Sequence, residues 1–303
     1  MNILQKPFFS VIITTFNRQD FILKAVNSVL EQSFQNFELI VIDDCSQDLT
    51  VELLETIEDS RFSYYKNNVN MERCYSRNLA INKANGQYIL VLDSDDYFES
   101  SHLHFWYLFI KENDFPNKLL VSNRKNHLLR TSEFNNLYLS FNSENPILSF
   151  FLNSVIPGQV CVPVQIAKDF PYIQEMVPFE DTELWMRISL MHEVLFNPLI
   201  FSYVYVEHKF NSVNVELYNI YLSRYNVIKK VVNTKKYSSF ISYQIISDVK
   251  NKCLYGIITF HKLNSSKFLQ LIWIFKSIFK YPTYDLKHKI YLIKECLFPS
   301  KSR

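Results

Sequence analysis

The residues Tyr88-Ile89-Leu90-Val91-Leu92-Asp93-Ser94-Asp95-Asp96 combine a strand signal with a cluster of acidic side chains. The first five residues form an apolar run rich in β-branched and aromatic residues, which is typical of a buried strand. Three carboxylates follow within four residues, and they raise each other's pKa unless a cation lies among them. Mg²⁺ or Mn²⁺ suits such oxygens, often with substrate phosphates as further ligands. The stretch therefore predicts a metal–diphosphate site at a strand end, with an ordinary acidic turn as the alternative.

The residues before this stretch alternate between strand-like and helix-like segments. The predicted order is strand, helix, strand, helix, strand, helix, over residues 8–14, 20–32, 37–42, 48–57, 62–65 and 72–84. Asn85-Gly86 is expected to close the last helix as its C-cap. This alternation predicts an α/β fold with a doubly wound, mostly parallel sheet and helices on both faces.

The pattern after Asp96 is less regular. A polar loop is expected over 123–145. Strands are predicted at 119–122, 159–162 and 194–206, and a helix is predicted at 181–191. Helical spacing dominates from about residue 217. We therefore expect two parts: a catalytic domain over 1–215 and a mainly helical C-terminal region over 216–303.

Composition narrows the class of protein. The 303 residues carry a net charge of +2, which gives no general case for a nucleic-acid partner. Only three glycines are present, which excludes glycine-rich phosphate loops and leaves metal or basic side chains to hold a phosphate. The cysteines are scattered without paired spacing, as in proteins of the reducing cytosol. We read no signal peptide and no apolar run long enough for a membrane span, so a cytoplasmic protein is expected.

Polar clusters follow three predicted strands: Thr14 to Asn17, Asp43-Asp44 and Asp93 to Asp96. In open parallel sheets, ligands bind in the crevice outside the carboxyl ends of the strands. Each cluster alone also fits a helix-leading loop or a turn. Together they predict one ligand-binding crevice.

The ordered set of motifs resembles family 2 glycosyltransferases, which have the GT-A fold. The matching stretches are Ser10 to Arg18, Leu39 to Asp48, Ser76 to Asn78, Gly86 to Asp96 and Phe179 to Trp185. They cover about the first two thirds of the chain. The resemblance implies transfer of a sugar from a nucleoside-diphosphate sugar to a glycan or lipid-linked acceptor, in bacterial cell-surface polysaccharide synthesis.

The resemblance also implies roles for single residues. The nucleotide is expected to lie among Thr14, Phe16, Asn17, Asp44, Arg77, Asp93 and Ser94, with Asn78 supporting the loop. Asp93 and Asp95 form the DxD motif that binds Mn²⁺ or Mg²⁺. Asp181 is the expected catalytic base, and Glu180 orients the sugar hydroxyls or acts as the base itself. For Glu180-Asp181, acidic residues that merely complement a helix N-terminus are the alternative.

The chemistry of Asp44 favours one class of donor. A carboxylate accepts a hydrogen bond from uracil N3–H and cannot pair in that way with cytosine, which lacks this proton. A UDP-sugar is therefore expected, with guanine and thymine nucleotides as alternatives. Direct displacement assisted by one base predicts inversion at the anomeric carbon.

Two departures from the family pattern stand out. The loop Asn70-Met71-Glu72-Arg73 lacks the usual glycine, and Arg73 is a candidate for a phosphate contact of its own. His208 is a candidate third metal ligand, with a partly exposed histidine at a strand end as the alternative. Two other functions stay open: a nucleotidyltransferase, and a non-catalytic nucleotide-sugar-binding subunit of a polysaccharide assembly.

The segment from Lys262 to Arg303 is strongly basic. It holds nine lysines and arginines against Asp285 and Glu295, a net charge of +7, interleaved with aromatic and aliphatic residues. This pattern predicts a peripheral helix on an anionic membrane, at the inner face of the plasma membrane. A helix that packs on the catalytic domain is the alternative.

Overall fold

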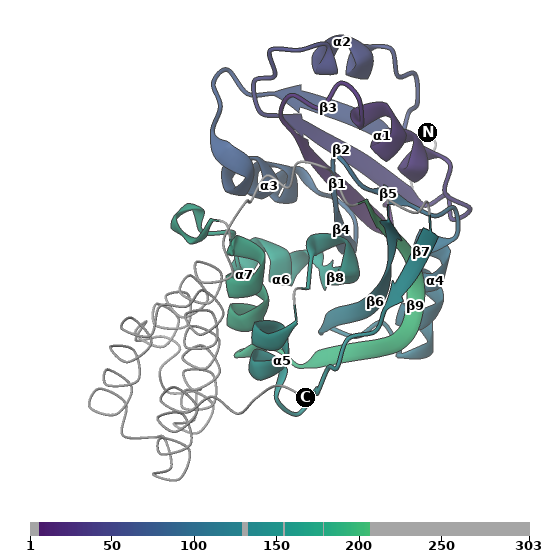
Figure 1. The fold of residues 1–303 in the computed structure, drawn as a ribbon, viewed down its shortest axis with the longest axis vertical. Helices are drawn as coiled ribbons and strands as arrows, with labels where there is room; N and C mark the ends of the chain where they lie inside the picture. Colours follow the sequence, from purple (N-terminus) through teal and green to yellow (C-terminus); the bar gives the residue numbers. More distant parts are fainter. Residues whose placement is uncertain (1–5, 129–132, 154, 178, 207–303) are drawn as a thin grey trace, which may run out of the picture. The chain divides into compact units, whose positions relative to one another are not determined.

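The computed structural model describes residues 6–128, 133–153, 155–177 and 179–206 (Figure 1). The chain divides into two compact units, Met1–Asn211 and Ser212–Arg303. The expected helical region over 216–303, the basic segment within it and His208 lie outside the described residues, so these remain predictions.

The first half of the chain forms the alternating elements that the sequence predicts. They are β1 (Phe9–Thr15), α1 (Ile22–Leu30), β2 (Phe37–Asp43), α2 (Thr50–Glu55), β3 (Phe62–Lys66), α3 (Glu72–Lys83) and β4 (Tyr88–Asp93). The strands β1, β2, β3 and β4 are parallel, in the spatial order β3-β2-β1-β4. Helix α1 packs against α2 and β5, whereas α3 packs against α6, on the other side of the sheet (Figure 1).

The second half extends the same sheet. Its elements are β5 (Tyr97–Phe98), α4 (His102–Glu112), β6 (Leu119–Leu128), β7 (Glu133–Leu137), α5 (Pro146–Leu152), the 3₁₀-helix η1 (Pro157–Gln159), β8 (Val160–Pro163), α6 (Val164–Asp169), the 3₁₀-helix η2 (Gln174–Met176), α7 (Glu180–Ser189) and β9 (Val194–Val206). The full order is β3-β2-β1-β4-β8-β6-β9-β5, with β7 paired to β6. Strand β8 runs antiparallel to both β4 and β6, so the sheet is mixed. Most strands still run in one direction, because β6 and β9 are parallel to each other and point the same way as β1 to β4.

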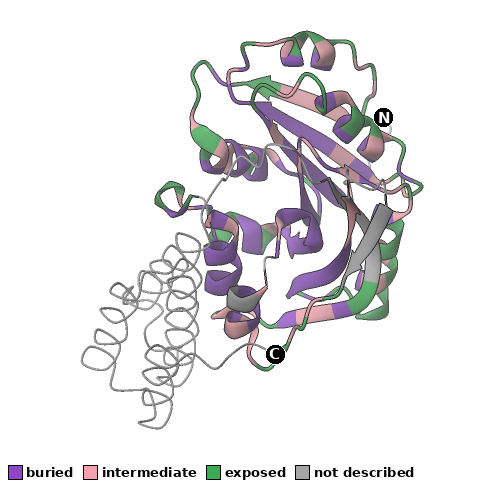
Figure 2. Cartoon of the chain, viewed as in Figure 1, coloured by how far each residue is buried: buried purple, intermediate pink, exposed green. Residues whose placement is uncertain are grey.

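The core explains why the central strands read as unbroken apolar runs. In β1, three successive residues, Val11, Ile12 and Ile13, are fully buried. Side chains of a strand alternate between the two faces, so both faces of this strand are covered. Figure 2 shows the resulting band of buried residues along the centre of the sheet.

The prediction of a loop over 123–145 was wrong for β6 and β7, whereas residues 138–145 are irregular as expected. Strand β6 continues to Leu128 and pairs with β7, and its polar residues Ser122 and Asn123 are buried. The Asn123 side chain accepts a hydrogen bond from the Leu139 amide, at 2.7 Å. The Gln159 side-chain nitrogen donates to the Ser122 carbonyl at 2.9 Å. Hydrogen bonds from residues distant in the sequence therefore satisfy these buried polar groups, which the local sequence pattern does not reveal.

The expected Asn85-Gly86 C-cap was also wrong. Helix α3 is capped by Ala84 in an extended conformation, and Gly86 does not adopt a positive φ. A Cβ at Gly86 would lie 2.6 Å from the Ser10 nitrogen, so glycine is required there for close approach to β1. Within the described part of the chain, no helix has the length and apolar character needed to cross a membrane.

Candidate active site

The three polar clusters lie together at the carboxyl edge of the sheet. In the parallel register, Thr14 is directly opposite both Ile42 and Asp93, and Thr15 is opposite Asp43. The Asp44 amide donates a hydrogen bond to the Thr15 carbonyl at 2.8 Å, which extends the β1–β2 pairing beyond the strands. These clusters therefore border one site, as in other open parallel sheets.

Asp44 is held in place through one of its two oxygens. The carboxylate is almost fully buried, and its Oδ1 accepts hydrogen bonds from the Asn67 side-chain nitrogen at 2.7 Å and the Met71 amide at 2.9 Å. Among the described residues, no donor bonds to Oδ2. An oriented carboxylate with one unused oxygen is suited to accept a hydrogen bond from a ligand.

The loop after β1 is fastened to the loop after β2. The Asn17 amide donates to the Ser46 hydroxyl at 2.9 Å, and its side-chain oxygen accepts from the Gln47 amide at 2.8 Å. Asn17 and Cys45 both have positive φ, which places a left-handed residue in each loop. The preceding Phe16 side chain is exposed, so an aromatic ring is presented to solvent at this edge.

The acidic stretch after β4 places two carboxylates where a ligand can reach them. The side chains of Asp93 and Asp95 are 32% and 27% exposed. Asp95 lies 3.6 Å from the Arg18 Nε, and Asp93 Oδ1 accepts a hydrogen bond from Arg77 Nη2 at 2.9 Å. Ser94, between them, is buried.

Arg77 joins this stretch to the start of α7. Its side chain is only 3% exposed and contacts three carboxylates. Besides Asp93, Nη1 donates to Asp181 Oδ1 at 2.9 Å and lies 3.4 Å from Glu180 Oε1. One arginine thus brings carboxylates from β4 and α7 into a single cluster.

The cluster changes the acidity of Asp181. Burial raises the pKa of Asp181 to about 7, against the lowering effect of Arg77. The negative charges of Glu180 and Asp93 contribute to this rise, whereas Arg73 opposes it. A carboxylate with a pKa near neutrality is suited to accept a proton from a hydroxyl group.

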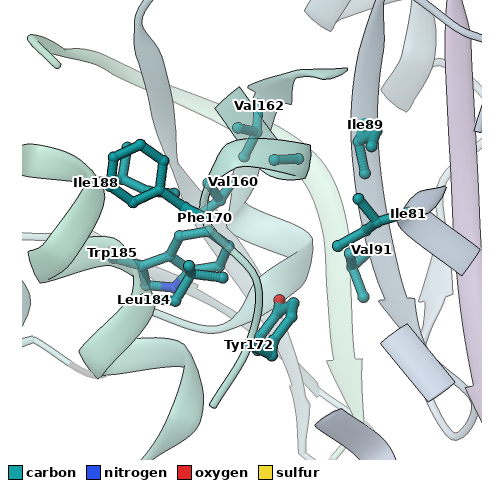
Figure 3. Close-up of a pocket in the computed structure, with 11 residues that line it drawn as sticks. Ile81, Ile89, Val91, Val160, Val162, Phe170, Tyr172, Leu184, Trp185 and Ile188 are labelled. Atoms are coloured by element: carbon teal, nitrogen blue, oxygen red, sulfur yellow. The ribbon is translucent and has the colours of Figure 1, made fainter. Parts of the chain in front are cut away.

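An apolar pocket lies beside the cluster, where α7 packs against the sheet (Figure 3). Side chains from α3, β4, β8, α6 and α7 line it, together with Phe170 and Tyr172. Its polar groups are few: the Trp185 indole donates to the Val155 carbonyl at 3.3 Å, and the buried Tyr172 hydroxyl has no hydrogen-bond partner in the structure. This pocket is a packing interface rather than a second polar site.

The residues present suit a divalent cation only in part. No group of three or more His, Cys, Asp or Glu side chains in the described ranges is arranged to hold a metal. The carboxylates of Asp93 and Asp95 are hard, accessible oxygen ligands, as Mg²⁺ and Mn²⁺ prefer. They fit a cation whose remaining ligands come from a diphosphate and water.

Sequence reasoning missed two residues that complete the site. Asn67, which orients Asp44, directly follows β3, so the rule used for the other strand ends identifies it too. Tyr172 stacks on the Arg77 guanidinium, 5.1 Å from its ring centroid. It lies in an irregular segment, where no local signal marks it.

The chain is similar to known proteins over its first half. The family model described as Glycosyl transferase family 2 matches residues 10–154. Over 100 residues, the chain is 41% identical to the UDP-Glc:alpha-D-GlcNAc-diphosphoundecaprenol beta-1,3-glucosyltransferase WfaP of Escherichia coli, covering 32% of this chain and 40% of that protein. The chain spans less than half the length of the curated relatives that it matches first.

Two solved structures share the fold. The crystal structure of S. aureus TarS 1-349 in complex with UDP-GlcNAc has a TM-score of 0.66 and 20% identity, covering 88% of this chain and 78% of that chain. The mannosyltransferase PcManGT from Pyrobaculum calidifontis, in complex with GDP-Man and Mn²⁺, has a TM-score of 0.60 and 13% identity, covering 98% and 88%. The expected GT-A fold is confirmed, and residues 10–154 of the chain are similar to glycosyl transferase family 2.

Proposed function

We propose that the protein is an inverting, metal-dependent glycosyltransferase. It transfers a sugar from a UDP-sugar to a hydroxyl group of a glycan or lipid-linked acceptor. One observation carries this proposal: Arg77 joins Asp93, at the diphosphate end of the site, to Asp181 and Glu180 at the start of α7. The groups needed to bind a donor and to accept a proton therefore lie within one side chain's reach of each other.

The donor base is recognised by Asp44 in this proposal. Its Oδ1 is held by Asn67 and Met71, which leaves Oδ2 to accept the N3–H of uracil. The exposed ring of Phe16 and the ordered loop at Asn17 border the same edge and enclose the nucleotide. The complex of S. aureus TarS with UDP-GlcNAc, a chain of the same fold, supports a uridine donor.

Asp93 and Asp95 would hold Mn²⁺ or Mg²⁺ together with the donor diphosphate. When bound, the cation supplies Lewis-acid stabilisation for the charge that develops on the leaving diphosphate. The Mn²⁺ in the mannosyltransferase complex supports this assignment.

Asp181 accepts the proton of the acceptor hydroxyl as that oxygen attacks the anomeric carbon. Its raised pKa gives the carboxylate useful basicity near neutral pH. Glu180 is almost fully buried and lies beside Arg77 and Arg73, at 3.4 and 3.7 Å, so it is less accessible to a substrate than Asp181. Attack in a single displacement inverts the configuration of the transferred sugar.

The test is a panel of nucleotide sugars, first ranked by thermal shift with Mn²⁺, because a bound donor raises apparent stability. The best donors are then incubated with glycan and lipid-linked acceptors, and products are identified by mass spectrometry. We expect UDP release and a β-configured or otherwise inverted product, with both lost in EDTA. Release of pyrophosphate would instead support a nucleotidyltransferase. Donor binding without turnover on any acceptor would support a binding subunit.

The basic segment over 262–303 would bring the enzyme to a lipid-linked acceptor. Each basic residue near an anionic membrane contributes about 1 kcal/mol, so several together hold a protein there reversibly. Sedimentation with anionic vesicles at low and high salt tests this, using the full chain and a version ending near residue 260. Equal and negligible binding of both forms at low salt would contradict it.

A further inference from the structure

One face of α3 is fastened to the segment that leads into α7. Cys74, Arg77 and Asn78 are spaced by three and four residues, so they lie on the same side of the helix. The Asn78 side chain bonds the Tyr172 main chain twice, donating to its carbonyl at 2.9 Å and accepting from its amide at 2.8 Å. Cys74 Sγ lies 3.7 Å from the Ile173 carbonyl. The helix that follows β3 therefore contacts this segment at Tyr172 and, through Arg77, at Asp181.

Burial leaves little of the Arg77 side chain accessible to a nucleotide. Both terminal nitrogens bond to carboxylates, and the third nitrogen, Nε, is buried with no hydrogen-bond partner among the described residues. With 3% of the side chain exposed, little of the guanidinium faces solvent. The Tyr172 ring covers it from one side.

We propose that Arg77 and Asn78 are positioning residues that hold the base-bearing segment 172–181 against the nucleotide-binding half of the sheet. The inference rests on the proposed function, because it is Asp181 whose position they determine. Arg77 determines the position of the Asp181 carboxylate relative to Asp93. Asn78 fixes the backbone at Tyr172, where the segment begins. This role differs from the nucleotide contact that the resemblance implies for Arg77.

Two substitutions separate positioning from nucleotide binding. Arg77→Lys keeps the positive charge but cannot bridge three carboxylates, because an ammonium group lacks the planar fork of guanidinium. Asn78→Ala removes both bonds to Tyr172 and alters no charge. Lys83→Gln is the control: it removes a cation from the same helix, where Lys83 lies over the Tyr65 ring at 3.8 Å, away from the cluster.

Three quantities are measured on the full chain. Hydrogen exchange of residues 172–181 reports positioning without requiring activity, calorimetry with UDP and Mn²⁺ gives nucleotide affinity, and steady-state kinetics gives kcat and the donor KM. We expect exchange to rise at least about tenfold in Arg77→Lys and Asn78→Ala, because a local tether is lost. Nucleotide affinity and donor KM should stay within about threefold of wild type, while kcat falls by about 10²-fold, as misplacement of a catalytic group predicts. Lys83→Gln should match wild type.

A different outcome would overturn the inference. If Arg77→Lys weakens nucleotide affinity by about tenfold or more while exchange of 172–181 is unchanged, Arg77 is a nucleotide contact. Should Arg77→Lys fail to fold by circular dichroism, Asn78→Ala decides on its own: unchanged exchange and unchanged kcat would refute the proposal. If the wild-type chain transfers no sugar, the proposed function fails, and the exchange data still judge the positioning role.

Discussion

The carboxylate of Asp181 lies 2.9 Å from the guanidinium of Arg77, measured from Oδ1 to Nη1. The two residues are 104 positions apart in the sequence. Burial raises the pKa of Asp181 to about 7, and the arginine prevents a larger rise. This pair therefore keeps the carboxyl group in the range where it is both ionised and basic near neutral pH.

Replacement of the expected base should separate binding from turnover. Asp181→Asn preserves the shape of the side chain and removes its basic oxygen, so we expect kcat to fall by about 10²- to 10⁴-fold. Donor affinity, measured by calorimetry with UDP and Mn²⁺, should change little. The matched variant is Glu180→Gln at the neighbouring position. Near-normal turnover of Asp181→Asn together with a large loss in Glu180→Gln would move the base assignment to Glu180.

The rate should depend on pH through the same carboxyl group. A base acts in its ionised form, so kcat/KM for the acceptor should rise with pH and level off above about pH 7, the pKa of Asp181. Below that pH the rate should fall about tenfold per pH unit, as expected for loss of one proton-accepting group. The profile is measured at saturating Mn²⁺. A flat profile between pH 5 and 8 would show that this group does not limit the reaction.

Removal of the second aspartate of the DxD motif should abolish metal-dependent donor binding. The Asp95 side chain is 27% exposed, and its carboxylate lies 3.6 Å from Nε of Arg18. We expect Asp95→Ala to lose transfer and to bind UDP equally in Mn²⁺ and in EDTA, as measured by calorimetry. Wild-type turnover that persists in EDTA would contradict the metal assignment.

Glu72, the first residue of α3, lies in the stretch 70–73 that lacks the expected glycine, and it has a φ of 67°. A left-handed conformation costs an L-residue about 1–2 kcal/mol, and glycine avoids most of this cost. We expect Glu72→Gly to raise the free energy of unfolding by about 0.5 kcal/mol in urea titrations, after the entropy cost of glycine. The control is Glu52→Gly, an exposed acid in the first turn of α2, which should lower it by about 1 kcal/mol. Equal losses in both variants would show that the loop is unstrained.

The buried hydroxyl of Tyr172 has no hydrogen-bond partner in the part of the chain that the structure describes. An unsatisfied buried polar group costs about 1–3 kcal/mol, so Tyr172→Phe should raise the free energy of unfolding by about 1 kcal/mol. The ring, which stacks on Arg77, is kept. For comparison, Tyr88 donates to the Pro116 carbonyl at 3.2 Å, so Tyr88→Phe should lower stability by about 1 kcal/mol. If Tyr172→Phe is also destabilising, a buried water binds the hydroxyl.

Much of the architecture could be read from local pattern. The apolar runs of β1, β2 and β4 and the helical spacing of α1 and α3 are local signals, because burial of a strand or a helix face leaves a fixed period in the sequence. The acidic clusters follow those strands directly, so their shared edge follows from the parallel order. The first residues of β6 were predicted as a strand, but its polar continuation from Asn123 was not, because the burial of Asn123 depends on a distant partner, Leu139.

The amino-acid sequence was sufficient to predict the α/β alternation, the polar strand ends and the motifs that resemble a glycosyltransferase family. Each of these depends on neighbours within a few residues, or on the alternating order of the elements. The contacts of Arg77 became known from the tertiary structure alone, because its partners Asp93, Glu180 and Asp181 come from two other elements. The tertiary structure likewise showed that Gly86 serves close packing against Ser10 rather than a helix cap. Contacts of this kind arise from how separate elements pack, and no local period in the chain encodes them.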